Sequence, residues 1–463
     1  MAFYSGSKTN QNLVFGDKGE ISNSSFAYSE AATVASTENK ITPSDGASAD
    51  EFGYSVAVGS GRIVVGAYLD DDNGSASGSA YIFDLDGTQL AKITASDGAA
   101  DDRFGRSVAV GNGRIVVGAY QDNNDNGSQS GSAYIFDLDG NQLAKITASD
   151  GAADDNFGTS VAIGGGRIVV GVYRDDDNGN NSGSAYIFDL NGTQIAKITS
   201  ADNEIADNFG DSVAIGNGRI VVGATGDDDN GGASGSVYIF DLDGTQIGKI
   251  SAGIFGASND HFGRSVAIGS ERIVVGVPQS DDNGGQSGSA YIFDLDGNQL
   301  SKITASDAAA NDNFGYSVAI GNGRIVVGAA GDDNPNPFSF NSGSAYIFDL
   351  NVTQLAKITA SDAATSDEFG RSVAVGNGRI VVGAWGDDDN NLPGSGSAYI
   401  FDLDGNQLGK ITSSNGDFNS SFGWSVAVGN GRIVVGARGD NTSQGSAHIY
   451  ETPNIKDIFS IVD

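Results

Sequence analysis

Runs of adjacent aspartates are the residues of this sequence whose type and spacing most directly suggest chemistry. Four runs stand out: Asp70, Asp71 and Asp72; Asp175, Asp176 and Asp177; Asp227, Asp228 and Asp229; and Asp387, Asp388 and Asp389. Crowded carboxylates repel one another unless a cation neutralises them. Because the chain has no Cys and only two His, oxygen ligands for Ca²⁺ are the metal chemistry that these runs suggest. The runs lack the alternating ligand spacing of an EF-hand loop, so solvated loops that keep the protein soluble are the alternative.

Aromatic and arginine side chains at two recurring positions form the second candidate site. One position follows each Phe-Gly pair and the other follows each Val-Gly-Ala or Val-Gly-Val segment, and both vary from copy to copy. The candidates are Tyr54, Arg106, Arg264, Tyr316, Arg371 and Trp424 at the first position, Tyr68, Tyr120, Tyr173, Trp385 and Arg438 at the second, and Phe338 and Phe340 in the longest loop that follows. Aromatic residues and Arg carry much of the binding energy of interfaces. We expect a ligand or partner site here, with packing that differs between copies as the alternative.

The elements that must position these residues come from an internal repeat. Phe-Gly recurs eight times, every 52 to 55 residues, beginning at Phe52 and ending at Phe422. Each copy contains four short segments rich in β-branched and aromatic residues, here called a to d, as in Ser-Val-Ala-Val, Arg-Ile-Val-Val-Gly-Ala, Ala-Tyr-Ile-Phe and Gln-Leu-Ala-Lys-Ile-Thr. Tight Gly-rich turns join a to b and c to d, whereas the b–c and d–a connections are longer and acidic. Four antiparallel strands per repeat, arranged radially, predict an all-β protein of the β-propeller class.

The two ends of the repeat region predict how the ring closes. Lys40-Ile41-Thr42 is a d segment with no a, b or c before it, and Ala447-His448-Ile449-Tyr450 is a c segment with no d after it. The first can complete the last, which gives an eight-bladed propeller closed by an N-terminal d strand; seven blades plus a degenerate unit is the alternative. We expect an N-terminal arm or linker over residues 1–37, the propeller over 38–452 and a tail over 453–463.

These units resemble FG-GAP repeats, the blades of integrin α-subunit propellers and of many bacterial surface proteins. Phe104-Gly105 corresponds to the first part of the motif and Gly118-Ala119-Tyr120 to the second, and Gly276-Val277-Pro278 comes nearest to its final proline. The resemblance implies a non-enzymatic binding or adhesion module. Two departures matter. Integrin-type propellers have seven blades, and they carry a calcium-binding Asp-rich motif between strands a and b, where this chain has only Gly-Asn-Gly or a similar turn.

Positions that hardly vary between the copies are expected to serve the fold. The Ser of Ser-Val-Ala is predicted to form a structural hydrogen bond, because no base accompanies it in every copy. An Arg opens each b segment and a Lys lies in each d segment; both could form rings that bind anions, but we favour ion pairing of the Arg with Asp in the c–d turns. The b–c and d–a loops carry most of the acidic residues, and only Arg103, Arg174 and Arg438 are expected to oppose them on that face. Arg438-Gly439-Asp440 matches an integrin-recognised tripeptide, which we interpret as chance.

Composition and charge narrow the function further. The net charge of −34 argues against nucleic-acid binding, and no apolar run is long enough to span a membrane. We expect a protein or glycan ligand bound at the acidic b–c and d–a loop face. A structural component of a virion, tail or filament, docked through residues 1–37, is one alternative; a propeller glycosidase or lyase, with Asp211 as the one acid at the first variable position, is another. The N-terminus lacks a signal-peptide pattern, so an extracellular or surface location would need a non-classical route or a virion.

Overall fold

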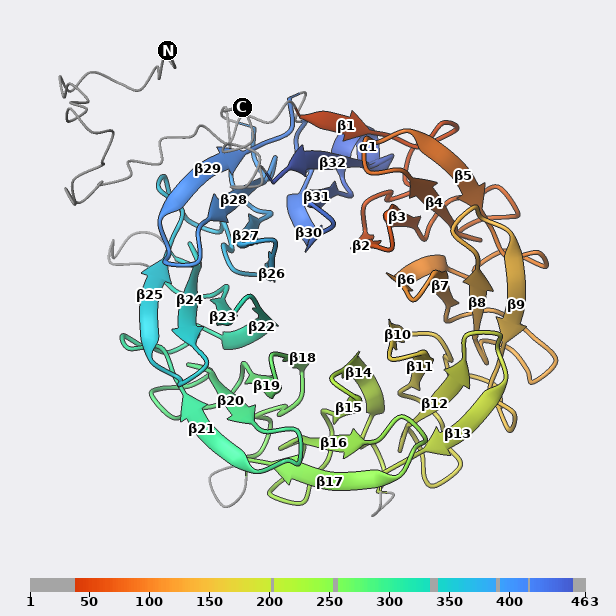
Figure 1. Ribbon diagram of the computed structural model, residues 1–463, viewed down its shortest axis with the longest axis horizontal. Coiled ribbons are helices and arrows are strands. Elements are labelled where there is room, and N and C mark those ends of the chain that lie inside the picture. Colours follow the sequence, from red (N-terminus) through yellow and green to blue (C-terminus); the bar gives the residue numbers. More distant parts are fainter. Residues whose placement is uncertain are drawn as a thin grey trace, which may run out of the picture.

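The chain forms a closed ring of eight four-stranded antiparallel sheets (Figure 1). The computed structural model describes residues 38–200, 204–252, 257–333, 340–388, 392–414 and 417–452. Each sheet is one blade, and its strands run a, b, c, d from the centre of the ring to the perimeter. The protein is therefore an all-β propeller with eight blades, as the repeat count predicts, and the seven-blade alternative is wrong.

The four strand positions contain the following segments, numbered from blade 1, which begins at β2, to blade 8, which begins at β30. Strands a are β2 (Ser55–Gly59), β6 (Phe104–Gly111), β10 (Ser160–Gly164), β14 (Phe209–Gly216), β18 (Ser265–Gly269), β22 (Phe314–Gly321), β26 (Ser372–Gly376) and β30 (Phe422–Gly429). Strands b are β3 (Arg62–Ala67), β7 (Arg114–Ala119), β11 (Arg167–Val172), β15 (Arg219–Ala224), β19 (Arg272–Val277), β23 (Arg324–Ala329), β27 (Arg379–Ala384) and β31 (Arg432–Ala437). Strands c are β4 (Ser79–Phe83), β8 (Ser132–Phe136), β12 (Ser184–Asp189), β16 (Ser236–Phe240), β20 (Ser289–Phe293), β24 (Ser344–Asp349), β28 (Ser397–Phe401) and β32 (Ser446–Glu451). Strands d are β5 (Gln89–Ile93), β9 (Gln142–Ile146), β13 (Gln194–Ile198), β17 (Gln246–Ser251), β21 (Gln299–Ile303), β25 (Gln354–Ile358), β29 (Gln407–Ile411) and, for blade 8, β1 (Asn39–Ile41).

The N-terminal strand β1 closes the ring. It pairs antiparallel with β32, so that Asn39 faces Ile449 and Ile41 faces Ala447. Blade 8 is thus built from both ends of the described chain, which confirms the predicted closure. The predicted arm, 1–37, and tail, 453–463, lie outside the described residues.

The hydrophobic core lies between neighbouring blades. Strands b and c are buried on both faces, which explains their continuous apolar sequence. Between blades 1 and 2, Phe104 is fully buried and its ring centroid lies 5.4 Å from that of Tyr134 and 6.0 Å from that of Phe136. Val64 and Ile82 of blade 1 belong to the same cluster. Each Phe-Gly phenylalanine therefore joins its own blade to the preceding one.

The residue after Phe-Gly is positioned by a β-bulge. In blade 2 the pairing of β6 with β7 shifts between Phe104 and Ser107, which leaves Gly105 and Arg106 outside the regular ladder. Gly105 has a φ of 94°, and a Cβ at this position would lie 2.3 Å from the carbonyl oxygen of Ser79, so only glycine fits. The Ser55 hydroxyl donates to the carbonyl oxygen of Gly105 at 2.8 Å, and the same bond between blades recurs in all eight copies, which confirms the structural role of this Ser.

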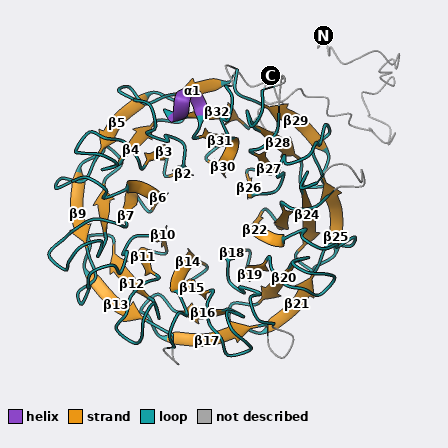
Figure 2. Cartoon of the chain, turned by 180° about the vertical axis from the view of Figure 1, so that it is seen from behind, coloured by secondary structure: helices purple, strands orange, loops and turns teal. Residues whose placement is uncertain are grey.

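One short helical turn, α1 (Asp440–Ser443), departs from the all-β pattern among the described residues. It lies in the b–c loop of blade 8, beside β32 (Figure 2). Asn441 and Thr442 within it have positive φ values, so it is not a regular helix. No helix in the described part of the chain is long and apolar enough to cross a membrane.

Candidate functional site

The two variable positions bring aromatic rings from consecutive blades into contact. Trp385 of blade 7 lies edge-on to Trp424 of blade 8, with ring centroids 5.6 Å apart. Trp424 in turn lies 5.9 Å from Tyr54 of blade 1, which is 4.5 Å from Tyr68 of the same blade. These rings form one row across three blades, beside the innermost strands.

Arginines extend this row in both directions. The Arg438 guanidinium lies 3.6 Å from the Trp424 ring centroid, and Arg371 lies 5.0 Å from that centroid and 5.1 Å from the Tyr316 ring. At the other end, Arg106 lies 4.4 Å over the Tyr54 ring and donates a hydrogen bond to its hydroxyl. Such stacking of cations on rings is favourable and fixes long side chains. We call this set the arc; it spans blades 6, 7, 8, 1 and 2 and comprises Tyr54, Tyr68, Arg106, Tyr316, Arg371, Trp385, Trp424 and Arg438.

Two glutamates that sequence reasoning missed hold the arc in place. Glu51 accepts from Arg438 at 3.1 Å, while Glu368 accepts from Arg371 and from the Trp385 indole N–H, both at 2.9 Å. Both glutamates directly precede Phe-Gly. The residue at this place has a positive φ in every copy, so it forms a third variable position that comparison of the copies could have revealed. Arg103, at the same position of blade 2, lies 5.7 Å from the Tyr68 ring.

The arc is half-buried and carries a local excess of positive charge. Among the described residues, the carboxylates that pair with its three arginines and Arg103 are those of Glu51 and Glu368, in a protein with a net charge of −34. Burial raises the pKa of Tyr54, and it raises the pKa of Tyr68 to about 12, so both hydroxyls stay neutral at physiological pH. The arc therefore offers ring faces, guanidinium edges and neutral hydroxyls, which suits recognition better than proton transfer.

The remaining predicted residues of this site are not among the contacts that define the arc, although Tyr120 lies near Tyr54, whose pKa is raised by burial and also by Tyr120. Tyr120 occupies the second variable position of blade 2 and is half-buried. Across the ring, the Arg174 guanidinium lies 5.2 Å from the Tyr173 ring centroid, and Arg264 lies 3.6 Å from Asp211. Phe340 is 61% exposed in the b–c loop of blade 6, whereas Phe338 falls outside the described residues.

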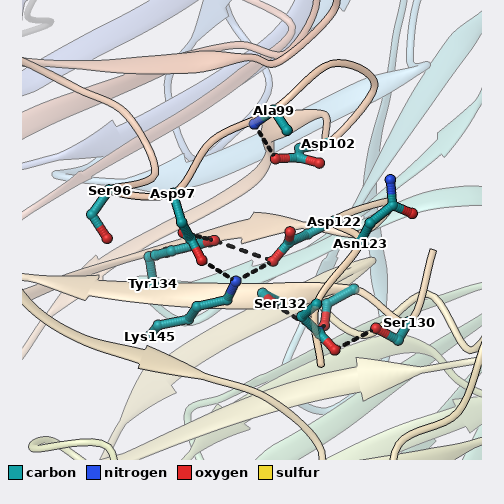
Figure 3. Close-up of polar contacts among 12 residues, drawn as sticks. Ser96, Asp97, Ala99, Asp102, Asp122, Asn123, Ser130, Ser132, Tyr134 and Lys145 are labelled. Carbon is teal, nitrogen blue, oxygen red and sulfur yellow. Dashed lines mark hydrogen bonds and ion pairs between the residues drawn. The ribbon is translucent and has the colours of Figure 1, made fainter. Parts of the chain in front are cut away.

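The aspartate runs are organised around the lysines of strands d. In blade 1 the Lys92 ammonium lies 3.0 Å from Asp70 and 2.8 Å from Asp45, and it also pairs with Asp72. The Tyr81 hydroxyl donates to Asp45 and Asp70. The first aspartate of the run is buried rather than solvated: the residue exposure is 2% for Asp70, Asp175 and Asp227 and 7% for Asp387. We call each such group a lysine cluster, and Figure 3 shows the one around Lys145.

Lysine clusters recur around the ring and correct two expectations. Each of the eight lysines, Lys40, Lys92, Lys145, Lys197, Lys249, Lys302, Lys357 and Lys410, pairs with at least one Asp. On the face formed by the b–c and d–a loops, a lysine from every blade, and not three arginines alone, therefore neutralises part of the negative charge. Strand d carries its Lys near the end that meets these loops. The runs are also not simply solvated, because their first aspartate is buried and ion-paired. Within the described ranges, no group of three His, Cys, Asp or Glu side chains that could hold a metal is found. Asp389 lies outside these ranges, and calcium binding stays a prediction.

The arginines of strands b link blades on the opposite face. Arg432, for example, donates to the carbonyl oxygen of Leu85 at 2.6 Å and pairs with Asp86 at 2.8 Å. Pairs of the same kind, as predicted, join Arg62, Arg167, Arg219 and Arg324 to c–d turns. The Arg438-Gly439-Asp440 tripeptide is not presented to a partner, because Asp440 is 1% exposed and pairs with Lys40.

Comparison with known proteins agrees with this architecture. The FG-GAP repeat family matches the chain eight times, at residues 36–83, 88–136, 141–188, 193–240, 245–293, 298–348, 352–401 and 406–450. The chain belongs to the FG-GAP repeat family. Each match runs from a strand d to the strand c of the next blade, so the sequence repeat is offset by one strand from the blade. No curated protein matches the chain significantly.

Proposed function

We propose that this protein is a non-enzymatic binding module that engages a protein or glycan through the arc. Membership in the FG-GAP repeat family indicates a module of the binding or adhesion type. The observation that carries the finer proposal is the concentration of both tryptophans and three arginines of the variable positions in five consecutive blades. A fold made of equal repeats does not require this asymmetry.

The chemistry of the arc supports a ligand that combines a flat or ring-shaped apolar surface with polar groups. Rings held edge-on or tilted leave part of their surface open, and guanidinium groups offer planar, multiple donors. Asp211, the acid considered for a glycosidase or lyase, lies across the ring and pairs with Arg264. We include in the proposal that the acidic loop face is exposed outside a cell or on the surface of an assembly.

The test is ligand binding by paired variants from the two sides of the ring. The full chain is applied to a glycan array and to cell surfaces, and the hits are measured by titration. Trp385→Ala combined with Trp424→Ala is expected to weaken binding at least about tenfold, as loss of central aromatic contacts does in other interfaces. Tyr173→Ala combined with Arg264→Ala is the matched control and is expected to bind like wild type. Equal binding by both folded double variants would overturn the assignment of the arc.

Assembly through residues 1–37 stays a separate prediction, since these residues lie outside the described chain. Truncating them is expected to leave ligand binding at the arc intact and to abolish any assembly that depends on them.

A further inference from the structure

In blade 2, as around Lys357 in blade 6, two ion-paired carboxylates are found at the cluster lysine among the described residues, and in blade 2 a cavity lies beside it. A lysine ammonium has three N–H donors. In blade 3 the Lys197 ammonium meets three carboxylates, those of Asp150 at 2.9 Å, Asp175 at 2.9 Å and Asp177 at 2.5 Å. Blade 1 has the same arrangement around Lys92.

In blade 2 the Lys145 ammonium pairs with only two carboxylates among the described residues, Asp97 at 2.5 Å and Asp122 at 2.7 Å (Figure 3). The side chain of Lys145 is 24% exposed, against 15% for Lys92 and 19% for Lys197. One N–H donor of Lys145 is thus left without a carboxylate.

The cause is a longer b–c loop with a different hydrogen-bonding pattern. Nine residues separate Asp122 from Ser132, whereas eight separate Asp175 from Ser184. The third residue of the run is Asn124, whose amide donates to the Gly131 carbonyl oxygen at 2.7 Å and whose oxygen accepts from the Ser130 hydroxyl at 2.6 Å. Asn124 is therefore turned into its own loop and cannot replace the missing carboxylate.

The place of that carboxylate is a cavity of about 480 Å³. Its lining consists of Asp97, Lys145 and Thr147 together with loop residues 123–126. The lining thus carries one cationic group and two carboxylates, those of Asp97 and Asp125, and the rest is amide and hydroxyl. Asp125 is exposed, and Asp97 is half exposed.

We propose that this cavity binds a small zwitterion of the α-amino acid type. The ligand carboxylate accepts from the third N–H of Lys145, as Asp177 does from Lys197 in blade 3. The ligand ammonium pairs with Asp97 and Asp125. A simple anion would be repelled by Asp97, Asp122 and Asp125, and a simple cation would leave the Lys145 donor unused. A zwitterion adds no net charge and satisfies both kinds of group.

The first experiment measures glycine binding to the full chain by saturation-transfer NMR and calorimetry. A ligand this small in an open polar site is expected to bind with a dissociation constant of about 1 mM. Acetate and methylammonium, which each carry one of the two charges, are expected to bind at least about tenfold more weakly. Absence of glycine binding, or equal binding of either single-charge probe, would overturn the proposal.

Variants then locate the site. Asp125→Asn removes one cavity carboxylate from an exposed loop and is expected to weaken glycine binding about fivefold, while Asp176→Asn, an exposed loop acid of blade 3, is the matched control and leaves it unchanged. If both variants behave alike, the site is not this cavity.

Exchange of loops between blades gives a second, independent readout. Replacing residues 123–129 by the sequence of 71–76 restores the shorter loop with its third carboxylate and is expected to abolish glycine binding. The reverse exchange replaces residues 71–76 of blade 1 by the sequence of 123–129. It is expected to create a second cavity and to raise the number of glycine molecules bound per chain from one to two. Retained glycine binding in the first chimera contradicts the proposal. If a chimera does not fold, the Asp125→Asn variant decides whether the proposal holds.

Discussion

The arc and the opposite side of the ring occupy the same backbone positions with different side chains. In blades 7, 8 and 1, Trp424 contacts both Trp385 and Tyr54, whereas the variable positions of blades 3, 4 and 5 include Thr159, Thr225 and Pro278. The bulge, the positive-φ residue before Phe-Gly and the Ser–Gly bond between blades recur on both sides. Residues that every repeat shares thus build the ring, whereas the variable residues give one part of its rim the aromatic and arginine contacts that we propose as a binding site.

The largest effect should be the same on both sides, because it concerns a residue that every blade shares. Phe369→Ala in blade 7 and Phe209→Ala in blade 4 each remove a fully buried ring, at the edge of the arc and across from it. Each is expected to lower the free energy of unfolding by about 3–5 kcal/mol. Urea unfolding of both variants is the measurement, and a difference of more than about 2 kcal/mol would show that the two sides are not equivalent in the fold.

Lysine clusters should also serve both sides, in proportion to the carboxylates they neutralise. Lys197→Met keeps the aliphatic stem but leaves three carboxylates without their cation, and we expect a loss of roughly 2–3 kcal/mol. Lys145→Met leaves two carboxylates and should lose less. Thermal and urea unfolding compare the two variants; a larger loss at Lys145 would contradict this ranking.

The variable positions should differ in stability between the two sides. Trp424→Ala removes contacts with Arg438, Arg371, Trp385 and Tyr54, and is expected to lower stability by about 1–2 kcal/mol. Tyr173→Ala loses the stacking of Arg174 on its ring and should change stability by less than about 0.5 kcal/mol. Equal losses would mean that the arc is not a packed unit. The same urea titrations supply the comparison.

Stability should depend on pH through buried aspartates found on both sides. Burial raises the pKa of Asp102 and Asp312 to about 6 and that of Asp155 and Asp367 to about 7, above the ordinary value of 3.8. A raised folded-state pKa means that folding takes up protons, so these groups add stability as pH falls from about 8 to about 5. We expect a melting temperature about 5 °C higher at pH 5 than at pH 8.

A matched variant tests this assignment. Asp367→Asn keeps an acceptor for the Ala364 N–H but cannot titrate, so the gain between pH 8 and pH 5 should shrink. An unchanged gain would exclude Asp367 as a source. Below about pH 4 the change of stability with pH should reverse. Burial raises the pKa of Asp97, but the hydrogen bond from Lys145 outweighs burial and lowers this pKa overall. Protonating Asp97 and similar groups then removes their ion pairs, so stability falls as the pH falls further.

Calcium should have the smallest effect, and the same effect on both sides. In blades 1, 3 and 4, for example, an ammonium already pairs with the buried aspartate of the run, so adding Ca²⁺ or EDTA is expected to move the melting temperature by less than about 2 °C. Calorimetry with Ca²⁺ provides the second readout. A larger shift, or measurable heat of binding, would show that calcium binds the aspartate runs in spite of the lysines.

Much of the fold could be predicted because it depends on patterns within one repeat. The Phe-Gly spacing, the turn residues and the unmatched segments at Lys40-Ile41-Thr42 and Ala447–Tyr450 predict eight blades and their closure. The turn aspartates likewise predict partners for the strand b arginines, although each partner lies in the next blade, as for Arg62 and Asp139. The sequence could not show that Trp424 is the more densely contacted residue, since its neighbours Trp385, Tyr54 and Arg371 come from other repeats.

The sequence by itself determined the class of fold, the number of blades, the identity of the closing strand and the variable positions. Only the tertiary structure decided which charges meet and which variable residues touch. Lys145 and Asp97 are 48 residues apart, and Glu51 and Arg438 are 387 apart. Local hydrogen-bonding and apolar periodicity repeat within about 50 residues, whereas ion pairs and ring stacking act through space over a few ångströms. Ring closure and the stacking of blades bring these distant groups within that range.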